Sequence, residues 1–339
     1  MIAISGLSFN LSSGSTSRFP SSKPVFAYYY GWYTKNAWYG GVGENSLAVA
    51  DIPSIGLYDS QNTSVIDSQI SEALSAGING FIASWWGPQS LTDNTDKIVI
   101  NQAMKFSGFS VTLYFETEII QEMNSSFVSE ETQIVNDVSY IMQNYASSEA
   151  FTQIGGRQVL FFYGVNNWPV QFWTNVTNAI HANYPELRLI SDSFSLTYLS
   201  AFDGASSYVD LGYMTQSVSL ENGTYPTFLQ ISQFAKSEGK LWLATATPGF
   251  NGTNDGKNQF PVVARNDGTT FIKGWDIAQN SNPDGIIVGT WNEFYEGTSI
   301  EPSTSYGTFY LQLTGQLSMI WRLPPSTHGI NFGYRIVRL

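Results

Sequence analysis

Residues 80–116 read GFIASWWGPQSLTDNTDKIVINQAMKFSGFSVTLYFE, in which two short apolar runs flank one longer amphipathic stretch. The two runs, Gly80–Trp85 and Ser110–Glu116, are mostly apolar without alternation, as is typical of parallel strands that are covered on both faces. The stretch between them predicts a helix over 94–107. A strand, a helix and a second strand in this order form a βαβ unit.

The same rhythm repeats along the chain from Lys23 onward. The sequence predicts eight strands, at Val25–Tyr30, Gly80–Trp85, Ser110–Glu116, Gln158–Tyr163, Arg188–Asp192, Val209–Met214, Lys240–Thr245 and Gly285–Trp291. It predicts helices at 62–76, 94–107, 129–146, 169–183, 196–202, 226–238, 268–281 and 308–322. This pattern predicts an α/β fold, a single (β/α)8 TIM barrel with its active site at the carboxyl ends of the strands.

The domain organisation follows from this pattern, since no break marks a second domain. We expect residues 23–322 to form the catalytic barrel. Residues 1–22 are rich in Ser and predict a flexible N-terminal arm. They lack the basic start and the apolar run of a signal peptide, so a signal or anchor would lie outside this sequence. Residues 323–339 predict a C-terminal extension.

Composition excludes several classes of function. The 339 residues contain no Cys and only two His, His181 and His328, so disulfides, thiolate nucleophiles and histidine-based metal sites are not expected. No stretch of about 18 apolar residues predicts a membrane span. The net charge of −12 disfavours nucleic acid as a partner. We expect no cofactor and no metal.

Charged residues make up only 12% of the chain and aromatic residues 15%, where about 25% charged is usual. A surface with few titratable groups suggests an extracellular, cell-surface or acid-exposed protein. The aromatic content suits a cleft for an oligosaccharide or polysaccharide, because the C–H faces of sugars pack on flat rings. Six N-x-[ST] sequons, weak indications of glycosylation, occur at Asn10, Asn62, Asn124, Asn175, Asn222 and Asn251.

The carboxylates of greatest interest follow the last predicted strand, in the run GTWNEFYEGTSIEP at 289–302. Hydrolysis of a glycosidic bond usually requires two carboxyl groups. Glu293 and Glu296 are three residues apart, so a helical turn after the strand would direct both into one cavity. Neighbouring aromatic residues would surround them with low-dielectric walls, which raise the pKa of a general acid. Glu116 ends the third predicted strand and points to the same mouth.

Two other interpretations of these acids were weighed. A glutamate in a loop is most often an ordinary solvated side chain, although two beside aromatic residues at a barrel strand end are more often functional. A large clan of retaining glycosidases places an Asn-Glu pair after strand four. Here the fourth predicted strand continues as Phe162-Tyr163-Gly164-Val165-Asn166-Asn167 without a Glu, which argues against that clan.

Several segments carry motifs in a fixed order. They are AYYYGWY (27–33), IPSIGLYDS (52–60), GINGF with SWWG (77–87), PGF (248–250), RNDG with Trp275 (265–275) and WNEFYEGTSIEP (291–302). Together they resemble glycoside hydrolase family 99, the endo-α-mannosidases and endo-mannanases. The last segment is similar to that family's WNEWHEGTxIEP motif and is the most specific of them. The resemblance covers roughly residues 25–322.

The resemblance implies a retaining endo-acting hydrolase of α-mannosidic linkages. It implies that Glu296 is the general acid/base and that Glu293 deprotonates the 2-hydroxyl of the sugar. The 2-oxygen then attacks C1 and gives a 1,2-anhydro intermediate, which water opens. An internal nucleophile is already positioned, which removes part of the entropic barrier.

The resemblance also implies which residues contact substrate. By the match these are Tyr30, Tyr58, Trp86, Glu116 and Tyr213. Trp32 and Trp291 are candidates because rings at strand ends are suited to stack on a sugar, and Arg265, Asn292 and Tyr295 complete the set. The tyrosine that should follow the segment Phe202-Asp203-Gly204 is either Tyr208 or Tyr213, and we predict Tyr213 as the substrate contact. Arg265 would hold either the loop or a sugar hydroxyl.

Two departures from the family leave the substrate open. Tyr295 stands where the family has His, and residues 34–39 contain none of the family's His residues. Three alternatives therefore remain: an α-mannoside, an α-glucan or another surface glycan, and a non-catalytic carbohydrate-binding protein of the cell surface.

Overall fold

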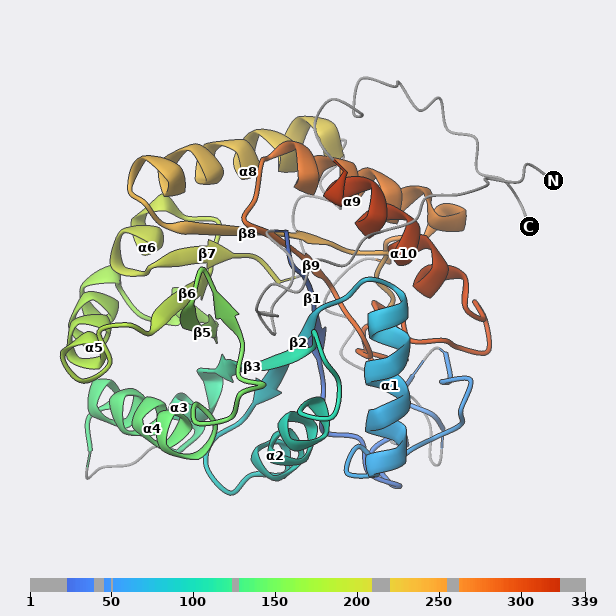
Figure 1. Cartoon of the computed structure of the whole chain (residues 1–339), viewed down its shortest axis with the longest axis horizontal. Coiled ribbons are helices and arrows are strands. Elements are labelled where there is room, and N and C mark those ends of the chain that lie inside the picture. The colour runs from blue at the N-terminus through green and yellow to red at the C-terminus, as the bar shows by residue number, and fades with distance from the viewer. Residues whose placement is uncertain are drawn as a thin grey trace, which may run out of the picture.

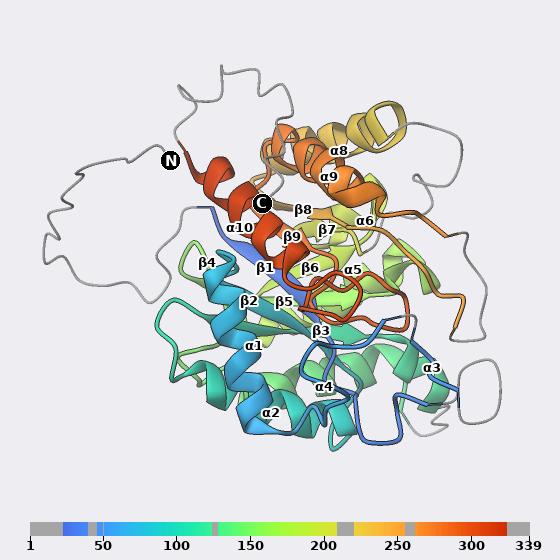
Figure 2. The same ribbon diagram turned by 90° about the vertical axis from the view of Figure 1, so that its right-hand side faces the viewer.

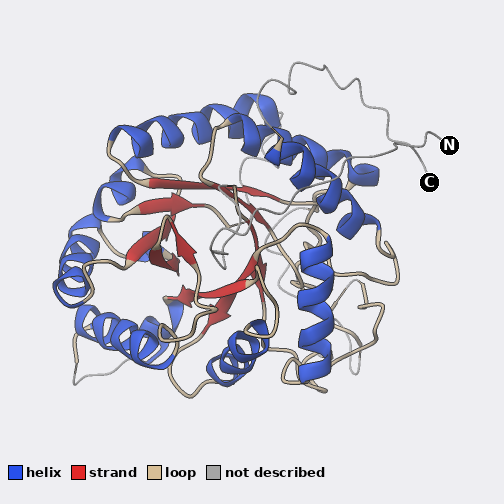
Figure 3. Ribbon diagram, in the orientation of Figure 1, coloured by secondary structure: helices blue, strands red, loops and turns tan. Residues whose placement is uncertain are grey.

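The computed structural model describes residues 23–39, 46–49, 51–123, 128–208, 220–254 and 262–323. Eight parallel strands close into a barrel that a ring of helices surrounds (Figures 1 and 3). The strands are β1 (Val25–Tyr29), β2 (Gly80–Trp85), β3 (Ser110–Glu116), β5 (Arg157–Tyr163), β6 (Arg188–Asp192), β7 (Gly204–Ser206), β8 (Leu241–Ala246) and β9 (Gly285–Val288). Pairing of β9 with β1 closes the barrel, and the predicted (β/α)8 fold is confirmed.

The helices follow the strands in the predicted order. They are α1 (Thr63–Ser75), α2 (Leu91–Ala103), α4 (Glu130–Asn144), α5 (Val170–Asn183), α6 (Leu196–Ala201), α8 (Leu220–Ser237), α9 (Thr269–Asn280) and α10 (Phe309–Arg322). Three additions were not predicted: α3 (Glu118–Met123) and the single-turn helices η1 (Val165–Asn167) and η2 (Asn266–Gly268). The short strand β4 (Gln153–Ile154) pairs antiparallel with β5.

The predicted position of the sixth barrel strand was wrong. The structure forms this strand at Gly204–Ser206, between β6 and β8, whereas the predicted segment, 209–214, lies outside the described residues. The observed strand consists of three small residues, so a search for bulky apolar runs overlooks it. Small size is required there, because a Cβ on Gly204 would lie 2.7 Å from Ile190 Cδ1 and 2.9 Å from Leu241 Cβ.

The continuous apolar runs are explained by two separate packing layers. In β1, Val25, Ala27 and Tyr29 pack outward against the helices. Phe26 and Tyr28 point into the barrel interior, where they meet side chains such as Ile82. Both faces of the strand are therefore buried, and hydrophobic burial favours apolar side chains at every position.

The loops after β1 and β9 lie side by side at the carboxyl end of the barrel (Figure 2). Pro53 and Ser303 form an antiparallel bridge, and the Ser54 N–H donates to the Pro302 carbonyl at 2.8 Å. These contacts join the first and the last loops of the fold, which brings the motif at 291–302 next to the one at 27–33. Among the described residues, no helix combines the length and the apolar character needed to cross a membrane.

One buried acid in the helical layer is costly for stability. Asp96 of α2 is fully buried, and neither of its carboxyl oxygens has a hydrogen-bond partner among the described residues. Burial, and secondarily the charge of Asp93, raises the pKa of Asp96 well above its usual range. The folded state therefore keeps this carboxyl protonated, since an unpaired buried charge is very unfavourable.

We predict that Asp96 makes the protein less stable as pH rises. Its folded pKa is raised, so its contribution to stability is complete below the unfolded pKa of about 3.9. That contribution declines by about 1.4 kcal/mol per pH unit as pH rises toward the folded pKa. Asp96→Asn removes this slope, so its melting temperature relative to wild type should increase between pH 4 and pH 7. The exposed helical control Asp276→Asn should run parallel to wild type, and an equally parallel Asp96→Asn curve would show that Asp96 is ionised.

Candidate active site

The loop after β9 forms a compact turn that fixes Glu293. The Thr290 hydroxyl accepts the Glu293 N–H at 2.8 Å, and the Thr298 N–H donates to the Glu293 carbonyl at 3.2 Å. The Glu293 carboxylate folds back and accepts the Tyr295 N–H at 2.8 Å. Glu293 is only 2% exposed. Its side chain is thus held by the backbone of its own turn.

Asn292 joins this turn to the end of the first strand. Its side-chain oxygen accepts the Tyr30 N–H at 2.8 Å, and its nitrogen donates to the Tyr30 carbonyl at 2.9 Å. The same nitrogen donates to the Tyr58 hydroxyl at 3.1 Å. The Tyr33 hydroxyl donates to the Asn292 carbonyl at 2.8 Å. The amide therefore continues the β1–β9 pairing beyond the strands and sets the position of Tyr30.

Glu293 and Glu296 both approach Tyr30 and Tyr208. Burial and the charges of Glu116, Glu293 and Glu296 raise the pKa of the Tyr30 phenol well above its usual range. Burial and the charges of Glu296 and Glu293 do the same for Tyr208. The two phenols stay protonated, and three carboxyl groups converge on one region at the carboxyl end of the barrel.

Tyr208 crosses the barrel mouth to Glu296. Its hydroxyl donates to Glu296 Oε2 at 2.7 Å. Glu296 is half-buried, unlike the enclosed Glu293. The loop that carries Glu296 is also bound to the segment after β8, because the Asn251 N–H donates to the Glu296 carbonyl at 2.7 Å. Glu296 is therefore held by the segments that follow β7 and β8, the two strands that precede β9 in the barrel.

Glu116 lies at the end of β3 and is 4% exposed. The Ser84 hydroxyl donates to Glu116 Oε1 at 2.6 Å and accepts the Trp86 indole N–H at 3.0 Å. Burial raises the pKa of Glu116 to about 8, against the effect of the Ser84 hydrogen bond. Near neutral pH this group is mostly a neutral carboxylic acid, which is able to donate a hydrogen bond.

Aromatic rings line the same mouth. Trp32 packs on Tyr30 with ring centroids 4.4 Å apart, and it lies 6.5 Å from Trp86 and 6.2 Å from Tyr295. Trp32, Trp86 and Tyr295 are half-buried. Partly exposed rings next to carboxyl groups provide flat apolar surface for the C–H faces of a sugar.

Four predicted substrate contacts have partners within the protein. Trp291 is fully buried between the strands and the helices, with its ring centroid 5.4 Å from that of Phe81. Asn292 is fully buried and occupied by the partners described above. The hydroxyl of the buried Tyr58 donates to Glu301 Oε2 at 2.8 Å. The contacts of Asn292 and Tyr58 thus support the loops that form the site.

Arg265 is the fourth of these residues, and it holds the loop. Its guanidinium donates to the carbonyls of Gly297 and Ser299 at 2.9 Å and 2.8 Å. It also stacks over the rings of Tyr306 and Tyr310, 4.4 Å and 4.5 Å from their centroids. Of the two roles considered for it, the structure shows loop support.

Of the two tyrosines considered after β7, the structure places Tyr208 in the site, while Tyr213 lies outside the described residues. Sequence reasoning also missed Ser84 and Asp192. Their positions in the sequence could have indicated them, since Ser84 lies in the SWWG motif and Asp192 ends a predicted strand. The polar partners of a catalytic acid come from distant strands, and spacing along one segment does not reveal them.

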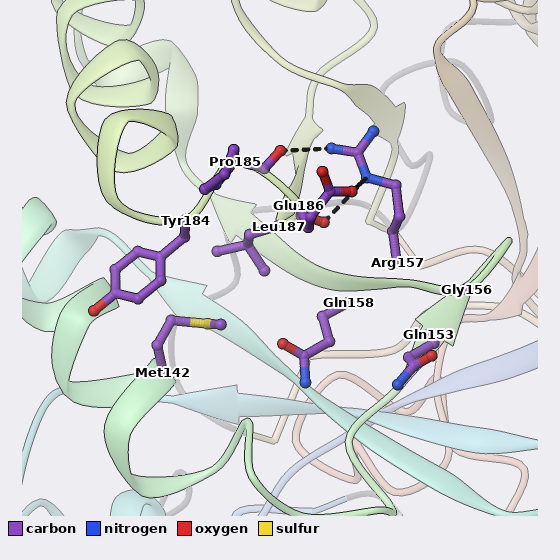
Figure 4. A pocket seen from close by; sticks show the side chains of 9 residues that line it. All are labelled: Met142, Gln153, Gly156, Arg157, Gln158, Tyr184, Pro185, Glu186 and Leu187. Atoms are coloured by element: carbon purple, nitrogen blue, oxygen red, sulfur yellow. Dashed lines mark hydrogen bonds and ion pairs between the residues drawn. The ribbon is translucent and has the colours of Figure 1, made fainter.

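A separate pocket of about 300 Å³ lies at the opposite, amino-terminal end of the barrel (Figure 4). It is bordered by the β4–β5 hairpin and by the loop that precedes β6. There Arg157 forms an ion pair with Glu186 at 3.2 Å and donates to the Pro185 carbonyl at 2.8 Å. Within the described ranges, no cluster of three or more His, Asp or Glu side chains is arranged to hold a metal ion.

Comparison with known proteins is consistent with this geometry. The chain matches glycosyl hydrolase family 99 over residues 22–313. It is 24% identical to the glycoprotein endo-alpha-1,2-mannosidase of Mus musculus over 281 residues, which are 76% of this chain and 58% of that protein. It is 22% identical to the Xenopus laevis protein of the same name, covering 74% of this chain and 57% of that protein.

The fold is also similar to a solved structure, the GH99 endo-alpha-mannosidase from Bacteroides thetaiotaomicron. The TM-score is 0.73 at 19% identity, and the match covers 88% of this chain and 97% of that one. A likeness at this identity shows the fold. The chain spans less than two thirds of the length of the curated relatives that it matches.

The Ser84 hydroxyl joins Glu116 to the Trp86 indole, and its removal tests whether these contacts serve substrate binding or only stability. Ser84→Ala leaves the Trp86 indole N–H without its acceptor and Glu116 without its donor. A lost buried partner costs about 1–3 kcal/mol, so we expect KM for a glycan substrate to rise about tenfold with a smaller change in kcat.

Ser281→Ala is the matched control, because Ser281 accepts the Trp242 indole N–H at 2.9 Å near the other end of the barrel. It should lower the melting temperature by a similar amount with unchanged KM. If Ser84→Ala and Ser281→Ala had the same KM, the hydrogen bonds of Ser84 would have no part in substrate binding.

Proposed function

Because the chain belongs to glycosyl hydrolase family 99, we propose that it is a retaining, endo-acting glycosidase that cleaves α-mannosidic linkages. The observation that carries the proposal is that Glu293, held in the turn after β9, and Glu296, bound by the Tyr208 hydroxyl, share one loop at the carboxyl end of the barrel. In barrels of this kind, the groups at that end perform the chemistry.

In the first proposed step, Glu293 removes the proton from the 2-hydroxyl of the sugar, and the 2-oxygen attacks C1. Glu296 donates its proton to the glycosidic oxygen as the bond from C1 to that oxygen breaks. The products are a 1,2-anhydro sugar and the released alcohol. In the second step, Glu296 takes a proton from water, and the water oxygen bonds to C1 as the bond from C1 to the 2-oxygen breaks. Glu293 returns its proton to the 2-oxygen. The anomeric configuration is retained because the configuration at C1 is inverted in each of the two steps.

The surroundings of the two acids support this division of roles. A base that acts on a hydroxyl within the sugar has to hold a fixed position, and Glu293 is enclosed and bound to the Tyr295 N–H. An acid that exchanges protons with the leaving group and then with water needs access, and Glu296 is half-buried. The Tyr208 hydroxyl donates to Glu296 Oε2, which orients this carboxyl group at the mouth of the barrel.

Mannoside is favoured as the substrate because the curated relatives carry the name endo-alpha-1,2-mannosidase. Tyr295 in place of the family's His makes an α-glucan or another surface glycan the second candidate. The Tyr295 hydroxyl donates to the Ala37 carbonyl, so this residue also shapes the wall formed by 32–39. A purely carbohydrate-binding role is disfavoured by the convergence of two acids. We place the protein outside the cell or on its surface, on the strength of its low content of charged residues.

Substitution of the two acids tests the proposed chemistry. Glu296→Gln and Glu293→Gln should each lower kcat on α-mannan or N-glycan oligosaccharides by about 10²–10⁴-fold, because each removes a proton-transfer group. Released oligosaccharide is the readout. Glu186→Gln, at the far end of the barrel, should match wild type. Full activity in Glu296→Gln would exclude the assignment.

The stereochemical course tests the retaining mechanism separately. Proton NMR during the first minutes of hydrolysis should show the α-anomer as the first product, before mutarotation. A synthetic 1,2-anhydro sugar should be hydrolysed by wild type and far more slowly by Glu296→Gln. First formation of the β-anomer would establish an inverting enzyme and would remove the anhydro intermediate.

A further inference from the structure

Asp192, the last residue of β6, has no role in the chemistry described above. Its side chain lies beneath the mouth of the barrel, where Oδ2 accepts the Tyr114 hydroxyl at 2.7 Å and Oδ1 accepts the Tyr208 N–H at 2.6 Å. Burial raises the pKa of Asp192 to about 6, against the two hydrogen bonds. At neutral pH the group is therefore mostly a carboxylate and accepts from both partners.

Tyr208 needs this acceptor because it lies beyond the sheet. Strand β7 is only three residues long, and its pairing with β6 ends at Asp192 and Ser206. The next backbone bond of this pair, from the Ser193 N–H to the Ser206 carbonyl, is 3.1 Å long. Two residues after the strand, the Asp192 side chain takes the Tyr208 N–H in place of a strand partner.

The ring of Tyr208 fits into a cluster of other tyrosines. Its centroid lies 5.3 Å from Tyr28, 6.1 Å from Tyr163 and 6.3 Å from Tyr114. The hydroxyl then reaches Glu296. A continuous series of contacts runs from Tyr114 through Asp192 and the Tyr208 backbone to the carboxyl group of Glu296.

We propose that Asp192 is a positioning residue for Glu296, acting through Tyr208: it fixes the Tyr208 backbone and so aims the phenol at the carboxyl group that transfers the proton. The inference rests on the proposed function of Glu296. In this proposal Asp192 acts on Glu296 only through the contact of its side chain with the Tyr208 backbone. Of the events that determine kcat/KM, its effect falls on protonation of the leaving oxygen, because that is the event in which the orientation of Glu296 matters.

Leaving-group dependence tests the proposal. A natural glycan needs Glu296 to protonate the departing oxygen, whereas an aryl glycoside with a dinitrophenolate leaving group does not. We expect Asp192→Ala to lower kcat/KM on the glycan by about 10–100-fold, the loss typical of a small misplacement of a catalytic group. On the dinitrophenyl glycoside, kcat/KM should change less than about threefold.

Tyr208→Phe completes the test as a double-mutant cycle. It removes the hydroxyl that reaches Glu296 but keeps the ring. If Asp192 acts through Tyr208, adding Asp192→Ala to Tyr208→Phe should lower kcat/KM on the glycan by no more than about twofold. Losses that multiply in the double variant, or that fall equally on both substrates, would overturn the proposal, as would unchanged activity in Asp192→Ala.

Asp203→Ala is the matched control, because Asp203 Oδ2 accepts the Leu189 N–H at 2.8 Å near the other end of the same strand pair. It should lower the melting temperature without a difference between the two substrates. If Asp192→Ala does not fold, Asp192→Asn replaces it, and kcat/KM should fall about fivefold on the glycan only. An equal loss of kcat/KM on both substrates, or no loss on either, would count against the proposal. Full activity in Glu296→Gln would instead remove the proposed function itself.

Discussion

The pairing of Asn292 with both backbone groups of Tyr30 is the constraint on which the site depends. Strands β1 and β9 are the first and the last of the barrel, and their registered pairs end at Ala27 and Val288. Beyond that point, Asn292 supplies the donor and the acceptor that a longer strand would have supplied. The turn that carries both glutamates is thereby fixed to the start of the chain.

The barrel interior explains the unusual composition. Its carboxyl end is filled by tyrosines from several strands, including Tyr28, Tyr114 and Tyr163. These rings bury apolar area, and their hydroxyls supply polar partners to Asp192 and Glu296. At the mouth of the barrel, the tyrosines and the acids Asp192 and Glu296 therefore form one network.

The sequence was sufficient to predict the elements whose residues face two buried layers. Continuous runs such as Gly80–Trp85, in which every residue is buried, predict a strand covered on both faces. It was insufficient for β7, where close approach of the flanking strands demands small residues. It also could not assign faces at the strand ends: Trp291 and Trp86 look alike in sequence, yet one packs outward in the core and the other lines the mouth.

The two glutamates differ in how they are held, although they are only three residues apart. Glu293 is bound by its own turn, so its position depends on local backbone geometry. Glu296 Oε2 accepts the hydroxyl of Tyr208, which follows β7, two strands away from β9 in the barrel. The relative placement of the two acids is therefore set by the neighbouring strands β7 and β8 as much as by the motif that contains them. A chain with the same motif but a different sixth or seventh strand would keep Glu293 in place and lose the alignment of Glu296.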